Sequence, residues 1–238
     1  MSARIKGSYG IDAPYVPIIM AGVVVVCVFL AFVNEKNIIW WLAWALLFAL
    51  QVLIYLFTTT RGKFTIWSRI IDRLGLTGSE QVLDVGCGRG MVLITAAQHL
   101  TTGRAIGIDL WRSKDQSGND PEATTRNAEV NGVAERITLE TADMSKLPFP
   151  DNTFDLVTAN VAIQNIKDRD LRRETILEIV RVTKPGGRIQ IVDIQYSGQY
   201  RDDLKAFGAK DVLLRNLGPI GWFGNPFFAS KLVSAHKP

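Results

Sequence analysis

The stretch Val82-Leu83-Asp84-Val85-Gly86-Cys87-Gly88-Arg89-Gly90 decides how this chain folds. An apolar strand pattern ends at an acid, three glycines follow at alternate positions, and a helical pattern begins at Met91. Because glycine has no Cβ, the backbone can turn sharply there and lie directly against a ligand. The next helix adds free N–H groups and a positive dipole end. The stretch therefore predicts a seat for a nucleotide-like ligand that carries a carboxylate or phosphate.

Strand and helix patterns alternate after this turn, which is typical of a doubly wound, mostly parallel sheet in an α/β domain. The sequence Lys184-Pro185-Gly186-Gly187 is predicted to end the third helix after the turn. We expect seven strands and one domain over residues 76–238. The predicted strands are 81–85, 104–108, 137–141, 154–159, 188–193, 211–216 and 228–236, and the predicted helices are 91–100, 121–131, 168–182 and 201–207.

The first sixty residues hold most of the apolar excess of a chain that is 47% apolar with a mean hydropathy of +0.13. Residues 16–33 and 38–57 carry no charge, and at about 1.5 Å per residue the first run nearly spans a hydrocarbon core of about 30 Å. A signal peptide and a buried pair of core helices are the alternatives. No small-x-small cleavage site follows the first run, and neither run has a polar face. The sequence favours a transmembrane α-hairpin over residues 1–60.

Flanking charge predicts the orientation of this hairpin. The connection between the two runs holds one Glu and one Lys, whereas both outer flanks are basic. The positive-inside rule then makes the chain an integral membrane protein with both termini and the domain after residue 60 in the cytoplasm. The basic residues are Arg4 and Lys6 before the first run, and Arg61, Lys63, Arg69 and Arg73 after the second.

Residues 64–74, inside a predicted connecting segment 61–75, have an amphipathic helical pattern. Phe64, Trp67 and Ile71 lie on one face, and Arg69 and Arg73 lie on the other. Such a helix either rests on anionic headgroups at the membrane surface or packs on the sheet as the first helix of the domain. The sequence favours packing on the sheet.

Three acids follow successive predicted strands. Asp84 ends the first, Asp109 ends the second, 19 residues after Gly90, and Asp143 follows the third. Any one of them is equally well explained as a loop acid or a helix cap. Together they lie where parallel sheets bind ligands, and an acid at the end of the second strand reaches ribose hydroxyls. No Cys/His cluster has metal-ligand spacing, so no metal is expected.

The combined motifs resemble those of class I S-adenosylmethionine-dependent methyltransferases. A nicotinamide enzyme would usually show Gly-x-Gly-x-x-Gly, whereas this chain has Gly-x-Gly-x-Gly after an acid. The resemblance covers residues 76–238, is closest to the ubiquinone/menaquinone methyltransferase branch, and implies a Rossmann-like methyltransferase fold with S-adenosylmethionine as cofactor. The matching stretches are 84–90, 106–109, 142–144, 147–155 and 181–187; 107–111 with 115–119 is similar to microbial methyltransferases that carry N-terminal spans.

The resemblance also implies a role for each matching residue. The three glycines would admit the cofactor to the backbone, and acids would hold its polar groups. The implied assignments are Gly86, Gly88 and Gly90 along the cofactor, Asp84 near the methionine amino group, Asp109 on the ribose hydroxyls, Leu110 on the adenine, Asp143 and the Met144 backbone at the adenine amino group, and Asn160 at the methyl-transfer site. Trp111 is a further candidate for the adenine contact and is not counted among these nine.

No catalytic residue is assigned. Five polar residues are candidates for the acceptor side, and a structural role is favoured for each. Gln164 stands where the family often has histidine, and a glutamine side chain cannot act as a general base. The five are Asn160, Gln164, Asn165, Asp193 and Tyr196.

Hairpin and motifs together predict a membrane-anchored methyltransferase that acts on a lipophilic small molecule, of lipid, quinone or isoprenoid type. The alternatives are methylation of a membrane protein or a hydrophobic secondary metabolite, and a non-catalytic cofactor-binding scaffold. The bilayer is an expected partner, homo-oligomerisation is left open, and no basic tract with interleaved aromatics predicts nucleic-acid binding. The aromatic-rich stretch Leu217–Phe228 either lines an acceptor pocket, touches the bilayer or forms a packed hairpin.

Overall fold

Short apolar strands form the seven-stranded sheet that organises the chain. In this computed structural model, which describes residues 5–238, the strand order is β3-β2-β1-β4-β5-β7-β6. Neighbours are parallel from β3 to β5, and β7 runs antiparallel between β5 and β6, which confirms the predicted mostly parallel sheet. The strands are β1 (Gln81–Val85), β2 (Arg104–Asp109), β3 (Ile137–Thr141), β4 (Phe154–Asn160), β5 (Thr183–Asp193), β6 (Lys210–Asn216) and β7 (Lys231–His236).

Helices cover both faces of this sheet, as a doubly wound arrangement requires. Successive side chains of a strand point to opposite faces, so Val82 joins one buried cluster with α3 and α4, while Leu83 joins another with α6 and α7. Asp120 and Asp168 cap α5 and α6 by accepting backbone N–H groups of the first turn. These helices are α3 (Lys63–Leu74), α4 (Met91–Ala97), α5 (Pro121–Val130), α6 (Arg169–Val182) and α7 (Ser197–Ala206).

Four predicted boundaries were wrong by three or more residues, and the two strand boundaries among them have a local cause. Helix α4 ends three residues before the predicted residue 100, and α7 begins four residues before the predicted residue 201. Strand β5 begins at Thr183 instead of residue 188, because Gly186 and Gly187 exchange backbone hydrogen bonds with Lys237. Strand β7 begins at Lys231 instead of residue 228, because Pro226–Phe228 forms a 3₁₀ turn.

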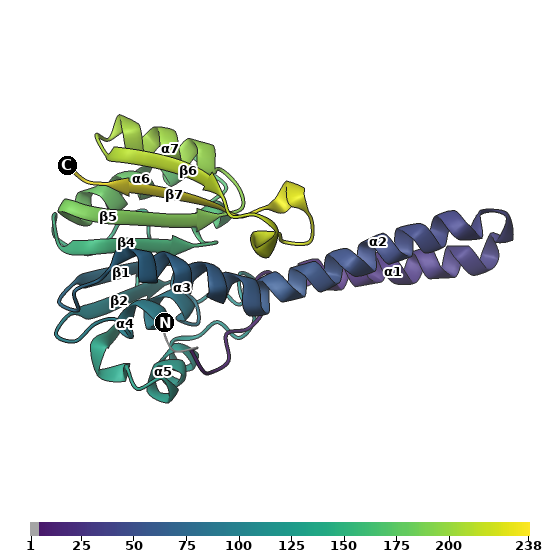
Figure 1. Cartoon of the computed structure of the whole chain (residues 1–238), viewed down its shortest axis with the longest axis horizontal. Coiled ribbons are helices and arrows are strands. Elements are labelled where there is room, and N and C mark those ends of the chain that lie inside the picture. Colours follow the sequence, from purple (N-terminus) through teal and green to yellow (C-terminus); the bar gives the residue numbers. More distant parts are fainter. Residues whose placement is uncertain (1–4) are drawn as a thin grey trace.

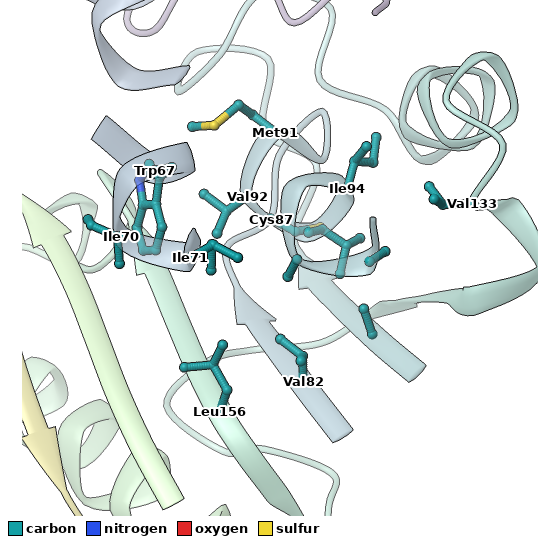
Figure 2. Close-up of a cluster of buried hydrophobic side chains, with 14 of the residues drawn as sticks. Trp67, Ile70, Ile71, Val82, Cys87, Met91, Val92, Ile94, Val133 and Leu156 are labelled. Atoms are coloured by element: carbon teal, nitrogen blue, oxygen red, sulfur yellow. The ribbon is translucent and has the colours of Figure 1, made fainter. Parts of the chain in front are cut away.

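Helix α3 packs its apolar face into the domain core. Trp67, Ile70 and Ile71 belong to the same buried cluster as Val82 and Leu156 of the sheet, and Figure 2 shows these side chains together. Trp67 and Ile71 are completely buried, and burying a side chain of this size stabilises a fold by roughly 1.5–3 kcal/mol. The prediction that this helix packs on the sheet is confirmed, and the same face is not available to a membrane surface.

Two long helices project from the domain side by side (Figure 1): α1 (Tyr15–Val33) and α2 (Ile38–Phe57). Both are long and apolar enough to cross a membrane, and only 17% and 11% of their most apolar windows are buried. A pair of core helices would be mostly buried, so that alternative does not hold. A π-helical turn, Thr58–Gly62, joins α2 to α3, so that a single helix runs from Glu35 to Leu74.

The residues before the hairpin run along the domain as an extended segment, which we call the N-terminal strap (residues 5–13). The backbone N–H groups of Lys6 and Ser8 donate to the amides of Asn131 and Asn127 at 2.8 and 2.9 Å. The chain therefore contacts the α/β domain both before and after the hairpin, although the divisions at residues 60 and 75 stay predictions. Arg4, which entered the orientation argument, lies outside the described residues.

Candidate active site

A cavity of about 380 Å³ opens at the carboxyl ends of β1, β2 and β4. This volume falls in the range of small-molecule sites. Of the nine predicted cofactor residues, Gly90 alone is absent from the lining; it sits at φ 81° and caps α4. The eight that line the cavity are Asp84, Gly86, Gly88, Asp109, Leu110, Asp143, Met144 and Asn160.

Two glycines of the turn give the cavity its floor. Gly86 and Gly88 have φ values of 71° and 51°, a conformation that side chains with a Cβ rarely adopt. A Cβ on Gly86 would lie 2.4 Å from the Cβ of Ala162, and one on Gly88 would lie 2.6 Å from Oε1 of Gln116. The turn therefore requires glycine for the backbone to form one wall of the cavity.

Asp109 ties this turn to the loop after β2. Its Oδ2 accepts the N–H of Gly88 at 2.9 Å, and its Oδ1 accepts the N–H of Trp111 at 2.6 Å and Nδ2 of Asn119 at 3.2 Å. A carboxylate has about four acceptor positions, so one is left for a ligand hydroxyl. The side chain lies at the end of β2, where the sequence predicts a ribose contact.

Asp84 is almost completely buried, although it lines the cavity. Its Oδ2 accepts the N–H of Leu93 at 3.0 Å, and its Oδ1 accepts the hydroxyl of Thr158 at 2.8 Å. Burial raises the pKa of this carboxyl to about 7, against the lowering effect of both hydrogen bonds. Burial likewise raises the pKa of the neighbouring Cys87 thiol well above its usual value, so the thiol stays protonated.

The far wall of the cavity is held from the first helix of the domain. The indole N–H of Trp67 donates to Oδ1 of Asn160 at 2.7 Å and fixes that amide at the end of β4. Asp143 accepts both the N–H and the hydroxyl of Ser145 through Oδ1. Leu110 lines the cavity with a partly exposed side chain, whereas Trp111 does not line it and donates its indole N–H to Thr141.

Three of the five polar acceptor-side candidates do not line the cavity. Asp193 is completely buried and accepts hydrogen bonds from the backbone of Gln164 and Ile194 and from the hydroxyl of Tyr200. Gln164 accepts a backbone N–H from Gln195, and the Tyr196 ring lies 3.6 Å from the Arg172 guanidinium. Their contacts are those of structural groups. The two candidates that line the cavity are Asn160 and Asn165.

The sequence reading missed a buried ion pair at the base of the hairpin. Lys63 Nζ lies 2.8 and 2.9 Å from the two carboxylate oxygens of Asp12, and both residues line the cavity. Thr59 of the π-helical turn and Gln116 also donate to this carboxylate, at 2.8 and 3.0 Å. Oε1 of Gln116 in turn accepts the N–H of Arg89 at 2.8 Å, so one polar network joins the strap, the hairpin and the glycine turn.

A weak signal for this network existed in the sequence. Gln116 and Asn119 belong to a stretch that resembles related methyltransferases, but nothing in that stretch assigned them a contact. Asp12 had no local signal at all, because its partner Lys63 is 51 residues away in the chain.

The charges of the lining suit a cationic ligand. Among residues 5–238, six carboxyl groups and three basic side chains line the cavity, which leaves an excess of negative charge. Oδ1 of Asn119, beside Asp109, is buried without a hydrogen-bond partner among residues 5–238. Such an orphaned acceptor is costly unless a ligand supplies a donor. A sulfonium-containing nucleoside with free hydroxyl groups fits both features.

Comparison with known proteins identifies the domain. The sequence profile of the family described as "Methyltransferase domain" matches residues 82–187, the segment that supplies every cavity-lining residue except Asp12 and Lys63. The chain carries a class I S-adenosylmethionine-dependent methyltransferase domain. This match and the named methyltransferase relatives confirm the predicted family. S-adenosylmethionine as the cofactor of the domain rests on this match together with solved methyltransferase structures of the same fold, one named as dependent on that cofactor and another in complex with S-adenosyl-L-homocysteine.

Two relatives belong to the predicted branch. The methyltransferase domain is 35% identical over 129 residues to demethylmenaquinone methyltransferase of Symbiobacterium thermophilum, covering 53% of this chain and 48% of the relative. It is 33% identical over 134 residues to the ubiquinone/menaquinone biosynthesis C-methyltransferase UbiE of Saccharophagus degradans, covering 56% and 50%. The chain therefore spans about half the length of these relatives.

Solved structures share the fold of the methyltransferase domain. A crystal structure of geranyl diphosphate C-methyltransferase from Streptomyces coelicolor, in complex with Mg²⁺, geranyl diphosphate and S-adenosyl-L-homocysteine, superposes with a TM-score of 0.57 at 15% identity. The superposition covers 73% of this chain and 79% of that one. At this identity the likeness shows the Rossmann-like methyltransferase fold alone.

Proposed function

We propose that this chain is a membrane-anchored methyltransferase that transfers a methyl group to a lipophilic small molecule, of lipid, quinone or isoprenoid type. The observation that carries the proposal is the position of the cavity relative to the hairpin. Asp12 lies three residues before α1, Lys63 lies six residues after α2, and both line the cavity. If α1 and α2 cross a bilayer, the cavity lies at the surface of that bilayer, where a lipophilic acceptor is concentrated.

The names of the relatives support this class of acceptor. Demethylmenaquinone and ubiquinone are lipid-soluble quinones, and the enzymes named for them share the methyltransferase domain. The proposed topology puts residues 34–37 outside and both termini with the domain inside the cytoplasm. Arg61, Arg69 and Arg73 support it by the positive-inside rule, whereas Lys63 has its charge paired with Asp12.

The chain's own residues have a limited task in this reaction. When bound, S-adenosylmethionine supplies an electrophilic methyl group, so the protein mainly has to bind and align its ligands. The backbone at Gly86 and Gly88 would lie along the cofactor, and Asp109 would accept from its hydroxyl groups. Asn160, held by Trp67, would bound the acceptor side. A general base is needed only if the acceptor must lose a proton.

The acceptor class is tested with the full chain in lipid nanodiscs, incubated with methyl-labelled S-adenosylmethionine and a membrane extract. We expect the label in the organic phase, in a small lipophilic product. Label in protein would instead support a membrane-protein substrate, and cofactor binding without any transfer would support a scaffold; either result contradicts the proposal.

The cofactor site is tested separately by calorimetry. Asp109→Ala removes a charged acceptor whose hydrogen bonds contribute roughly 1.5–3 kcal/mol each, so affinity for S-adenosylmethionine should fall by about 10- to 100-fold or more. Asp211→Ala, which changes an exposed acid outside the cavity, should leave the affinity unchanged. Equal affinities for the two variants would contradict the assignment of Asp109.

A further inference from the structure

The loop between β6 and β7, residues 217–230, is rich in aromatic side chains and does not line the cavity; we call it the aromatic loop. The sequence left three readings open for it, of which an acceptor-pocket wall is one. Figure 1 shows this loop, in yellow, at the end of the sheet from which the hairpin projects, beside the start of the hairpin. The structure thus separates the aromatic loop from the cavity and brings it to α2.

Contacts attach this loop to the hairpin at several points. The hydroxyl of Thr58 donates to the carbonyl of Trp222 at 2.6 Å, and the rings of Phe223 and Tyr55 meet edge to face at 5.5 Å. Farther along α2, Nδ2 of Asn225 donates to Oε1 of Gln51 at 3.0 Å. The loop therefore follows α2 from the π-helical turn toward the middle of the helix.

The contact with Asn225 accounts for the presence of Gln51 in α2. It places a carboxamide in a helix that is otherwise apolar around it, and an unpaired amide in hydrocarbon is costly. Asn225 supplies a partner for that amide. Since Gln51 lies six residues before the end of α2, at 1.5 Å per residue the loop reaches about 9 Å along the helix. The polar layer on each side of a bilayer core is only about 5–7 Å thick, so this depth reaches the hydrocarbon boundary.

Asn225 also presents two phenylalanines to the outside. Its Oδ1 accepts the N–H of Phe227 at 3.0 Å and caps the 3₁₀ turn Pro226–Phe228. Phe227 is 92% exposed and Phe228 is 49% exposed, whereas Phe223 of the same loop is buried. One side chain thus binds α2 with its nitrogen and holds the exposed turn with its oxygen. The exposed rings therefore belong to a loop that is attached to α2, whose own apolar side chains are largely exposed.

We propose that Pro226, Phe227 and Phe228 form a third membrane contact, inserting into the interfacial layer of the leaflet that surrounds the base of the hairpin. The occupant of this surface is lipid, because the turn is continuous with a lipid-facing hairpin and lies at the depth where aromatic rings are favoured. The contact fixes the tilt of the methyltransferase domain, so that the cavity keeps a constant orientation to the bilayer. This inference rests on the proposed membrane anchoring.

The test uses nitroxide spin labels on the full chain in nanodiscs, and compares the accessibility of each label to oxygen and to a water-soluble nickel complex. Labels are placed in Phe227→Cys, in Leu213→Cys as a matched control, and in Phe29→Cys as a reporter of the span. All three native side chains are strongly exposed, so labelling does not disturb the core. The unsubstituted chain, whose Cys27 and Cys87 are both buried, provides the background signal.

We expect the labels at residues 227 and 29 to be severalfold more accessible to oxygen than to nickel, and the label at residue 213 to show the reverse. A water-accessible label at residue 227 beside a lipid-protected label at residue 29 would overturn the third contact and leave the anchoring intact. A water-accessible label at residue 29 would overturn the anchoring itself and, with it, the third contact.

Discussion

The α/β domain and the helical hairpin place the same kinds of side chain in opposite surroundings. In the domain, Leu83 and Leu156 are completely buried, whereas Leu46 of α2 is 72% exposed. Contiguous apolar surface in water costs about 25 cal/mol per Å² and marks a binding surface or a lipid contact. The difference teaches that hydrophobic content alone does not define a core. The domain carries its own apolar interior, whereas the hairpin leaves most of its apolar side chains exposed.

The two regions also treat polar groups differently. The domain buries carboxyl groups such as Asp84 and Asp193 and satisfies each with several hydrogen bonds. Within α1 and α2 the single carboxamide is Gln51, which is paired with Asn225 of the aromatic loop. Where the regions meet, the Asp12–Lys63 pair is buried at the edge of the cavity. The predictions below test this contrast, beginning with the junction.

Lys63→Met should have the largest effect. It leaves the Asp12 carboxylate buried without its cation, and breaking one side of a buried pair costs about 3–5 kcal/mol. The thermal unfolding midpoint of the detergent-solubilised chain should fall accordingly. Adding Asp12→Asn to the same chain removes the stranded charge and should recover most of the loss. A double variant as unstable as the single one would show that the charge itself does not matter.

Asp84→Asn should change how stability depends on pH. The pKa of Asp84 is raised to about 7 in the fold and returns to its ordinary value near 4 on unfolding, so its contribution to stability is complete below pH 4. That contribution is lost as the pH rises to 7 and should amount to roughly 4 kcal/mol at most. The asparagine keeps the bond from Leu93 and can donate to the Thr158 hydroxyl.

The measurement is thermal unfolding without cofactor between pH 4 and pH 8. The variant should match the unsubstituted chain at pH 4 and exceed its stability at pH 8. Some dependence on pH should remain, because burial also raises the pKa of Asp193 to about 7. Parallel curves for the two chains across the whole range would contradict the proposed titration.

Leu46→Arg and Leu213→Arg make the same change at two exposed leucines, 72% and 65% exposed, one in the hairpin and one on β6. In a bilayer the first should cost about 2.5–3.5 kcal/mol, because an arginine near the middle of a span is poorly tolerated. The second should change stability by no more than about 0.5 kcal/mol. The readout is the fraction of chain recovered in the membrane after expression; equal fractions would remove the distinction between the regions.

Trp67→Phe should have the smallest effect on stability. It deletes the donor to Asn160 inside the domain, and a buried bond of this kind contributes about 1–2 kcal/mol. Because Asn160 lines the cavity, acceptor turnover should fall more than cofactor affinity. Trp111→Phe is the matched control, since it deletes an exposed indole bond, to Thr141, outside the cavity. Equal losses of turnover would contradict a positioning role for Trp67.

Most of the secondary structure, and much of the site, followed from local sequence pattern. The strands were predicted because apolar runs of strand length recur between glycine and acid breaks, and the cavity was predicted because carboxyl ends of parallel strands meet. Eight of the nine predicted cofactor residues line it, although their individual roles stay predictions. The boundaries at β5 and β7 failed because backbone bonds to Lys237 and a 3₁₀ turn set them.

The sequence by itself determined the family, the sheet and the apolar hairpin, because each follows from patterns that are local in the chain. Only the tertiary structure decided how the hairpin is joined to the cavity. Asp12 binds Lys63, 51 residues away in the chain. Trp67 donates to Asn160, 93 residues away, and Asn225 donates to Gln51, 174 residues away. Contacts of this range depend on how whole elements pack, and no local period specifies them. The same packing moved the aromatic loop away from the cavity and onto the hairpin.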